Sequence, residues 1–229
     1  MELDVTFMTN AVETIPKEFK DQATLYRSVM MTYYAAIREV QTKLEILNDD
    51  LQVRTSRNPI EFIKVRLKSP ESILNKMQRY SLDKTIQNLS KINDIAGVRV
   101  ICTYINDIYD VANMLVNQDD VKLVQIKDYI KKPKSNGYRS LHLVIEVPVF
   151  FSNEKRQMKV EVQIRTIAMD FWSTIEHDVE YKHIISANDD IKAELKECAT
   201  ISHDLDLRMQ EIKTKLKGIR DETIQRNQN

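Results

Sequence analysis

An unbroken apolar stripe near the N-terminus is the feature that most constrains how this chain can fold. Its positions alternate steps of four and three residues, a spacing that puts them on one face of a helix. They are Phe19, Ala23, Tyr26, Met30, Tyr33, Ile37, Val40, Leu44, Leu47 and Leu51. A long helix with a narrow apolar seam is therefore predicted over residues 19–51. The seam fits packing against the rest of the chain and packing between subunits equally well.

A second stripe of the same kind lies near the C-terminus. Its apolar positions are Ile191, Leu195, Cys198, Leu205, Met209, Ile212, Leu216 and Ile219, with Ser202 as an interruption. These positions predict a second long helix that ends near Gly218. Sustained heptads are common in oligomers, so the two stripes together predict a homo-oligomer.

Between the two stripes the apolar pattern alternates and becomes rich in β-branched residues, which predicts strands over 98–103, 121–126, 141–147 and 159–165. Helical spacing predicts helices over 71–79, 105–117 and 167–182. This interleaving indicates an α/β or α+β class with one sheet. The expected organisation is a helical segment at 1–57, a catalytic domain at 58–185 and a helical segment at 186–229.

Composition narrows the cellular setting more than the function. Basic and acidic residues number 34 each, so net charge gives no argument for a nucleic acid or a membrane as partner. Cys102 and Cys198 are the only cysteines, and Cys102 lies in an apolar run, which favours reduced thiols over disulfides. The N-terminus has no apolar stretch of signal or membrane-span length. A cytoplasmic protein without a membrane partner is expected.

The segment 127–142, KDYIKKPKSNGYRSLH, has the composition of a nucleotide-binding loop. It surrounds Tyr138 with cations, and it contains Gly137, one of three glycines in the chain. Tyr138 fits either a turn tyrosine or a ring on which a base stacks. The neighbouring cations favour a nucleotide; they are Lys127, Lys131, Lys132, Lys134 and Arg139.

Two carboxylates occupy positions that suit a metal. Asp94 opens the segment DIAGVRVIC, just before a predicted strand, and Glu161 lies on the polar face of the strand at 159–165. Together they can hold a hard cation such as Mg²⁺, which prefers oxygen ligands. Taken alone, Asp94 fits a turn or helix cap equally well, and the polar face of a single strand needs no function.

The segment RLKSPESILNK combines cations with a helix start. Ser69 is a candidate N-cap and Pro70 suits the first helical position, while Arg66, Lys68 and Lys76 supply positive charge. A helix N-terminus flanked by cations is a natural phosphate site. By itself, such a charge run is more often a solvated surface.

Five motifs in this order resemble the synthetase domain of the Rel/Spo alarmone synthetases: RLKSPESILNK, DIAGVRVIC, KDYIKKPKSNGYRSLH, EVQIRT and DFWSTIEHDVEYK. They span about residues 59–182 and leave only flanking helices, so the chain resembles a stand-alone small alarmone synthetase, nearest to the type called RelP. The resemblance implies an α+β fold in which a nucleotidyltransferase-like mixed β-sheet is flanked by helices, with long N- and C-terminal helices.

The resemblance also implies an activity, a cofactor and an assembly. Members of the family transfer the β,γ-pyrophosphate of ATP to the ribose 3′-hydroxyl of GDP or GTP, releasing AMP and forming the alarmones ppGpp or pppGpp of the stringent response. The implied cofactor is Mg²⁺, and the implied assembly is a homotetramer.

The site residues implied by the resemblance follow the motif positions. Asp94 and Glu161 are expected to bind Mg²⁺, with Glu161 also taking the proton of the 3′-hydroxyl. The residues expected to bind ATP are Arg66 and Arg99 around adenine and Lys68, Ser72 and Lys76 on the phosphates. The residues expected to bind GTP or GDP are Tyr138 stacked on guanine, Lys127, Lys134, Asn136 and His142 on phosphates and ribose, and Gln163 and Arg165 as support on the same strand face.

Two departures from the family pattern limit these expectations. Gln125 stands where many members carry an arginine, two residues before Lys127, which leaves the preference between GDP and GTP open. The segment before Pro59 contains no histidine, so the metal-dependent hydrolase domain of the large bifunctional members is not expected.

Two other functions remain alternatives. The first is a nucleotidyltransferase that moves AMP and releases pyrophosphate. The second is a non-catalytic oligomeric scaffold in which the basic loop and Tyr138 hold RNA or a nucleotide. Asp94 and Glu161 argue against the scaffold, because carboxylates repel a phosphate backbone unless a metal lies between them.

Overall fold

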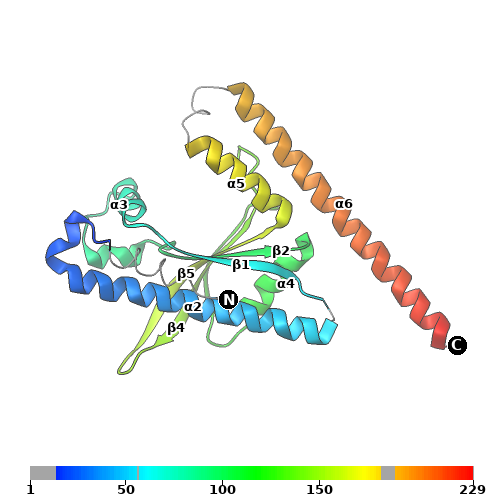
Figure 1. The fold of residues 1–229 in the computed structure, drawn as a ribbon, viewed down its shortest axis with the longest axis horizontal. Helices are drawn as coiled ribbons and strands as arrows, with labels where there is room; N and C mark the ends of the chain where they lie inside the picture. The colour runs from blue at the N-terminus through cyan, green and yellow to red at the C-terminus, as the bar shows by residue number, and fades with distance from the viewer. Residues whose placement is uncertain (1–13, 56, 182–188, 229) are drawn as a thin grey trace.

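A mixed five-stranded sheet organises the fold (Figure 1). The computed structural model describes residues 14–55, 57–181 and 189–228. The sheet has the order β1-β2-β5-β4-β3, in which β2 and β5 are parallel and the other neighbours antiparallel. Its strands are β1 (Ile60–Leu67), β2 (Ala96–Cys102), β3 (Lys122–Asp128), β4 (Leu141–Phe150) and β5 (Lys155–Thr166). The predicted α+β class and all four predicted strands are confirmed.

Strand β1 is the element that the sequence pattern did not reveal. Its residues Ile63 and Val65 alternate with Lys64 and Arg66, but a register irregularity between Ile60 and Phe62 breaks the period at its start. An edge strand of this kind, with three charged residues among its eight, resembles a solvated segment when only the local pattern is considered. Only its pairing with β2 identifies it as a strand, and this pairing joins residues that are far apart in the sequence.

Helix α2 (Ala23–Thr55) covers the apolar face of the sheet, next to helix α4 (Ile105–Val116) (Figure 1). A short 3₁₀ helix, η1 (Lys17–Gln22), precedes α2. The middle of the predicted seam is fully buried, as Tyr26, Met30 and Ile37 show. The N-terminal seam therefore packs on the chain's own sheet.

Helix α3 (Pro70–Arg79) begins directly after β1, and η2 (Ile86–Lys91) leads on towards β2. The predicted cap is confirmed, because the Ser69 hydroxyl accepts a hydrogen bond from the backbone N–H of Ser72, and Pro70 occupies the first turn. Ile73 and Met77 fix the helix to the core from its apolar side. On the polar side of the same helix, Lys76 reaches Asp94, which precedes β2.

Helix α5 (Ile167–Tyr181) follows β5 and lies on the opposite side of the sheet from α2, and α6 (Asp189–Gln228) runs beside it (Figure 1). The prediction that the last helix ends near Gly218 is wrong. An exposed glycine with open space around it costs a helix only about 1 kcal/mol, so α6 continues past it. The domain boundary predicted between 185 and 186 lies outside the described residues, as does Lys182, the predicted end of α5.

Helix α6 docks through its polar side. Asp206 accepts a hydrogen bond from the Thr166 hydroxyl at 2.6 Å, and Lys213 pairs with the fully buried Asp107 at 2.8 Å. The predicted apolar seam faces the other way: Leu205, Met209, Ile212, Leu216 and Ile219 are each about half exposed or more. None of the described helices is long and apolar enough to cross a membrane.

Candidate active site

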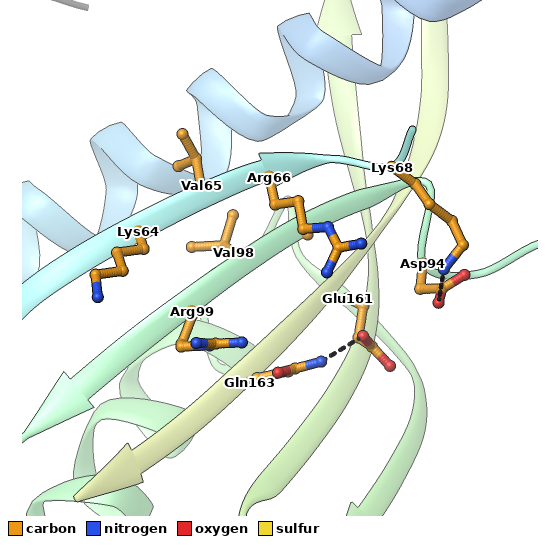
Figure 2. Close-up of a pocket in the computed structure, with 10 residues that line it drawn as sticks. Lys64, Val65, Arg66, Lys68, Asp94, Val98, Arg99, Glu161 and Gln163 are labelled. Atoms are coloured by element: carbon orange, nitrogen blue, oxygen red, sulfur yellow. Dashed lines mark hydrogen bonds and ion pairs between the residues drawn. The ribbon is translucent and has the colours of Figure 1, made fainter. Parts of the chain in front are cut away.

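A cleft of about 310 Å³ opens on the face of the sheet opposite α2 (Figure 2). It lies over β1, β2 and β5, beside the turn that precedes β2. Its lining residues are Lys64, Val65, Arg66, Lys68, Asp94, Gly97, Val98, Arg99, Glu161 and Gln163. Six of the residues predicted for ATP or metal binding, or for support of that strand face, therefore meet in one cavity.

Strand alternation and register explain why these side chains converge. Gly97 of β2 lies between Arg66 of β1 and Glu161 of β5, and Arg99 lies beside Gln163. Residues paired across neighbouring strands point to the same face. Figure 2 shows Val65 turned towards α2, whereas Arg66 and Glu161 point into the cleft. Gly97 contributes no side chain, so the floor between Arg66 and Glu161 stays open.

Asp94 is held at the rim of the cleft by two ammonium groups. Its Oδ2 lies 3.0 Å from Lys68 Nζ and 2.7 Å from Lys76 Nζ, the first following β1 and the second on α3. Burial alone would raise the pKa of Asp94, but hydrogen bonds and charge from Lys76 and Lys68 outweigh it and hold the pKa below its ordinary value. The carboxylate is therefore ionised at neutral pH.

Glu161 is also held in its ionised form, by an amide and an imidazole rather than by ammonium groups. Gln163 Nε2 donates to its Oε2 at 2.8 Å, and His142 Nδ1 lies 3.5 Å from its Oε1. Burial acts to raise the pKa of Glu161, while the hydrogen bonds from His142 and Gln163 lower it, and the net pKa lies below its ordinary value. The negative charge of Asp94 acts to raise the pKa of Glu161, because the two carboxylates are close enough to repel each other.

The residues present fit a divalent cation. Asp94 Oδ1 is buried and receives no hydrogen bond from the described residues, so it retains free lone pairs inside the site. With Glu161 it offers two hard oxygen donors, and among the described residues no group of three or more metal-binding side chains occurs. A cation held by two carboxylates keeps positions for water and phosphate oxygens, as Mg²⁺ does at nucleotide sites.

Beyond the cleft, the polar face continues as a buried network. Asp170 of α5 accepts hydrogen bonds on Oδ1 from Arg99 at 3.1 Å and from Arg165 at 3.2 Å. Arg165 is 3% exposed, and it also donates to the hydroxyl of Tyr138. The network thus joins the cleft to the basic loop.

Tyr138 is buried at the junction of that loop with α5 and α6. It packs with Trp172 and Ala199, and its hydroxyl lies 2.8 Å from His142 Nε2. Lys134 Nζ lies 4.7 Å from the ring centroid. The Tyr138 ring is therefore packed against α5 and α6 and is also contacted by the ammonium group of an exposed lysine.

Comparisons with known proteins identify the family of the chain. The family model described as "Region found in RelA / SpoT proteins" matches residues 65–186. The chain is 43% identical to GTP pyrophosphokinase YwaC of Bacillus subtilis over 214 residues, which are 93% of this chain and 98% of YwaC. This chain belongs to the RelA/SpoT family.

Solved structures of RelA/SpoT relatives share the fold. Small alarmone synthetase 2 from Bacillus subtilis superposes with a TM-score of 0.76 at 44% identity, covering 83% of this chain and 98% of that one. Small alarmone synthetase 1 from the same organism, bound to its product pppGpp, gives 0.78 at 34% identity over 85% and 99%.

The remaining predicted residues of this RelA/SpoT site surround the cleft without lining it. Ser72 lies at the start of α3, where its hydroxyl contacts that of Ser69 at 2.8 Å. Lys127 of β3 pairs in register with His142 and is exposed. Asn136 donates to Glu176 of α5 at 2.9 Å. Of the residues predicted to bind ATP, Arg66, Lys68 and Arg99 thus line the cleft, whereas Ser72 and Lys76 lie on α3. Of those predicted to bind GTP or GDP, Gln163 alone lines the cleft.

Two residues of this site were missed by sequence reasoning. Lys64 lines the cleft, and its signal was the alternation of Lys64 and Arg66 with Ile63 and Val65. Asp170 connects Arg99 to Arg165, but it had no role in the prediction although it lies inside a recognised motif. A carboxylate that joins two arginines from different strands leaves no local pattern in the sequence.

Proposed function

We propose that this chain is an ATP:GTP/GDP 3′-pyrophosphotransferase that makes ppGpp or pppGpp and AMP in the stringent response. The observation that carries the proposal is the cleft itself, in which Asp94 and Glu161 lie among the side chains of Arg66, Lys68 and Arg99. Such a site suits two polyphosphate nucleotides and a metal. YwaC, whose similarity extends over nearly the whole chain, is a GTP pyrophosphokinase.

On the ATP side, Arg66 and Arg99 flank adenine, and Lys68, Ser72 and Lys76 bind the phosphates. The ion pairs of Lys68 and Lys76 with Asp94 support this assignment, because they hold both ammonium groups beside the carboxylate that would bind the metal. Asp94 and Glu161 would hold Mg²⁺, which neutralises charge on the phosphate oxygens. As phosphates arrive, Lys68 and Lys76 transfer from Asp94 to them and free its oxygens.

On the acceptor side, guanine stacks on Tyr138, and Lys127, Lys134, Asn136 and His142 orient phosphates and ribose. Gln163 and Arg165 support the strand face behind them. The 3′-oxygen attacks the β-phosphorus of ATP, the bond from that phosphorus to the bridging α,β-oxygen breaks, and AMP leaves with that oxygen. Glu161 takes the proton of the 3′-hydroxyl. The protein's main contribution is alignment and charge neutralisation.

We propose further that the enzyme is a cytoplasmic homotetramer. Both thiols are free, and the apolar seam of α6 is exposed in the single chain, where a second copy would cover it. The seam of α2 is already buried and is not available for this.

The decisive test is transfer from γ-labelled ATP with GDP or GTP and Mg²⁺, resolved by chromatography. Label should move to a more highly charged guanosine nucleotide with release of AMP. Glu161→Gln should lower the rate by at least about 10²-fold, and Glu146→Gln, a carboxylate of β4 outside the cleft, should stay near wild type.

The same assay separates the alternatives. Label released as free pyrophosphate would instead indicate AMP transfer. A folded protein that transfers nothing and binds RNA without a divalent metal would be the scaffold.

A further inference from the structure

Arg165 is a buried guanidinium with every donor in use. Its side chain is 4% exposed, and it has five N–H groups. Their partners are Ser140 Oγ at 3.4 Å, Asp170 Oδ1 at 3.2 Å, Ser173 Oγ at 3.0 Å, Tyr138 Oη at 2.5 Å and Gln163 Oε1 at 2.9 Å. The last two share the nitrogen Nη2. Because this guanidinium is shielded from water, water does not compete for its hydrogen bonds.

The contact with Tyr138 starts a chain of fixed direction, here called the tyrosine chain. A guanidinium only donates, so Tyr138 Oη accepts from Arg165, and its own proton is free for His142 Nε2 at 2.8 Å. A neutral imidazole that accepts on Nε2 carries its proton on Nδ1. That nitrogen lies 3.5 Å from Oε1 of Glu161.

The contact with Gln163 starts a second chain, here called the glutamine chain. Arg165 can face only the amide oxygen of Gln163, so the amide nitrogen must point the other way. That nitrogen donates to Oε2 of Glu161 at 2.8 Å. The three residues alternate along β5 and share one face, so the strand itself sets their spacing.

Both chains start at Nη2 of Arg165, and they end at the two carboxylate oxygens of Glu161. We propose that Arg165 is a positioning residue that orients the Glu161 carboxylate through both chains. It sets the tautomer of His142 and the amide orientation of Gln163, and these two donors hold Glu161 from behind. The outward lone pairs of Glu161 then face Asp94 and the cleft. This inference deepens the proposed function, since it rests on Glu161 acting in pyrophosphate transfer.

The proposal explains why arginine suits this position. Only a planar fork presents two donors from one nitrogen while its other nitrogens bind Asp170 and two serines. Removing a residue that hydrogen-bonds to a metal ligand and orients it typically lowers activity by about 10- to 100-fold, and we expect an effect of this order here. A buried arginine kept only for stability would lack such an effect on turnover.

The kinetic test compares Tyr138→Phe, Arg165→Met and the double variant. Tyr138→Phe keeps the ring and removes only the hydroxyl link. We expect each single change to lower kcat by on the order of 10- to 100-fold with a smaller change in the acceptor KM. The double variant should fall within about threefold of Arg165→Met, because both changes break the same chain. Losses that multiply, or a Tyr138→Phe effect confined to the acceptor KM, would overturn the proposal.

Ser173→Ala is the matched control, because it removes a partner of the same guanidinium that leads into neither chain. Its kcat should stay within about threefold of wild type. If it loses as much as Tyr138→Phe, the effect reflects the general packing of Arg165, and the proposal fails. Urea unfolding of each variant identifies a change that acts by destabilising the fold.

A second measurement does not depend on turnover or on the folding of Arg165→Met. Nitrogen NMR of the histidine-labelled wild-type protein, with His142→Gln for assignment, reports which ring nitrogen carries the proton. We expect the neutral ring to carry its proton on Nδ1 and to leave Nε2 bare, and we expect a changed Nε2 signal in Tyr138→Phe. The opposite tautomer would overturn the proposal even in an active enzyme. Absence of pyrophosphate transfer in wild type, with the expected tautomer, would defeat the proposed function and with it the catalytic meaning of the chains.

Discussion

Helices α2 and α6 arise from the same apolar spacing, yet they use it in opposite ways. In α2 the seam is the buried face, and Tyr26, Met30 and Ile37 have no exposure. In α6 the seam faces solvent, and the other face is held to the domain by the polar contacts of Asp206 and Lys213 and by the small buried side chain of Ala199. The difference teaches that periodicity identifies an apolar helix face without identifying its partner.

The two helices should therefore respond to different perturbations. The attachment of α2 depends on apolar burial, which changes little with pH or salt. The attachment of α6 depends on a hydrogen-bonded carboxyl, Asp206, and on the ion pair of Lys213 with Asp107. We expect large effects of side-chain truncation in α2 and electrostatic effects in α6.

The largest effect is expected from Ile37→Ala in α2. Truncating a fully buried isoleucine should lower the free energy of unfolding by about 2–5 kcal/mol, because it removes apolar contacts and leaves a cavity. Urea unfolding followed by circular dichroism measures it. Ile46→Ala, on the exposed side of the same helix, should change the value by less than about 0.5 kcal/mol. Equal losses at the two positions would mean that the seam does not hold α2 in place.

Asp206→Asn in α6 tests the pH side of the comparison. Burial raises the pKa of Asp206 to about 6 from the ordinary 3.8, partly offset by the Thr166 hydroxyl and Arg139. Because the folded state holds this proton more tightly than the unfolded chain, this stabilising contribution is complete below pH 3.8 and is lost as the pH rises through 6.

The asparagine variant keeps an oxygen for the Thr166 hydroxyl and cannot ionise. It should equal wild type below about pH 4 and exceed it by up to about 3 kcal/mol above pH 6. Urea midpoints across this range measure the difference, and a difference independent of pH would refute the account.

Lys213→Met should have a smaller effect that depends on salt. Asp107 keeps its two hydrogen bonds to Arg57, so the variant loses only one partly exposed ion pair, worth about 1 kcal/mol at low salt and less at high salt. Thermal unfolding at two ionic strengths measures it. Lys215→Met, exposed on the same helix, is the control and should show no comparable salt dependence.

The smallest effect on unfolding is expected from charges in the α6 seam. Ile212→Glu with Leu216→Glu should change the unfolding free energy of the isolated chain by less than about 0.5 kcal/mol, because both side chains are half exposed or more. The same change should dissociate the proposed homotetramer, as light scattering at micromolar concentration would report. A wild-type monomer under these conditions would contradict the assembly.

Much of the fold could be predicted because its signals are local. Alternation marked β2, β3, β4 and β5, and the spacing of threes and fours marked the helices. Strand order could not be predicted in this way, since the parallel pairing of β2 with β5 joins residues far apart in the sequence. Strand β1 was missed for the related reason that only its pairing identifies it as part of the sheet.

The candidate site divides along the same line. Asp94, Glu161 and the cations around them could be predicted, because residue type and motif position point to phosphate and metal chemistry. The link of Asp170 to Arg99 and Arg165 could not, since it depends on how α5 lies across two strands. Nor could the sequence show that Lys68 and Lys76 share one oxygen of Asp94.

Gly137 of the basic loop and Ala199 of α6 lie so close together that neither position has room for a larger side chain. Gly137 adopts a φ of +93°, and a Cβ there would lie 2.6 Å from the Cβ of Ala199 on α6. The basic loop and the last helix can approach this closely only while both residues stay small. A mutational scan should therefore show the two sites as the least tolerant of added volume in their segments. The helix that the proposed oligomer would use for assembly is therefore also the one that limits the size of residue 137 in the basic loop.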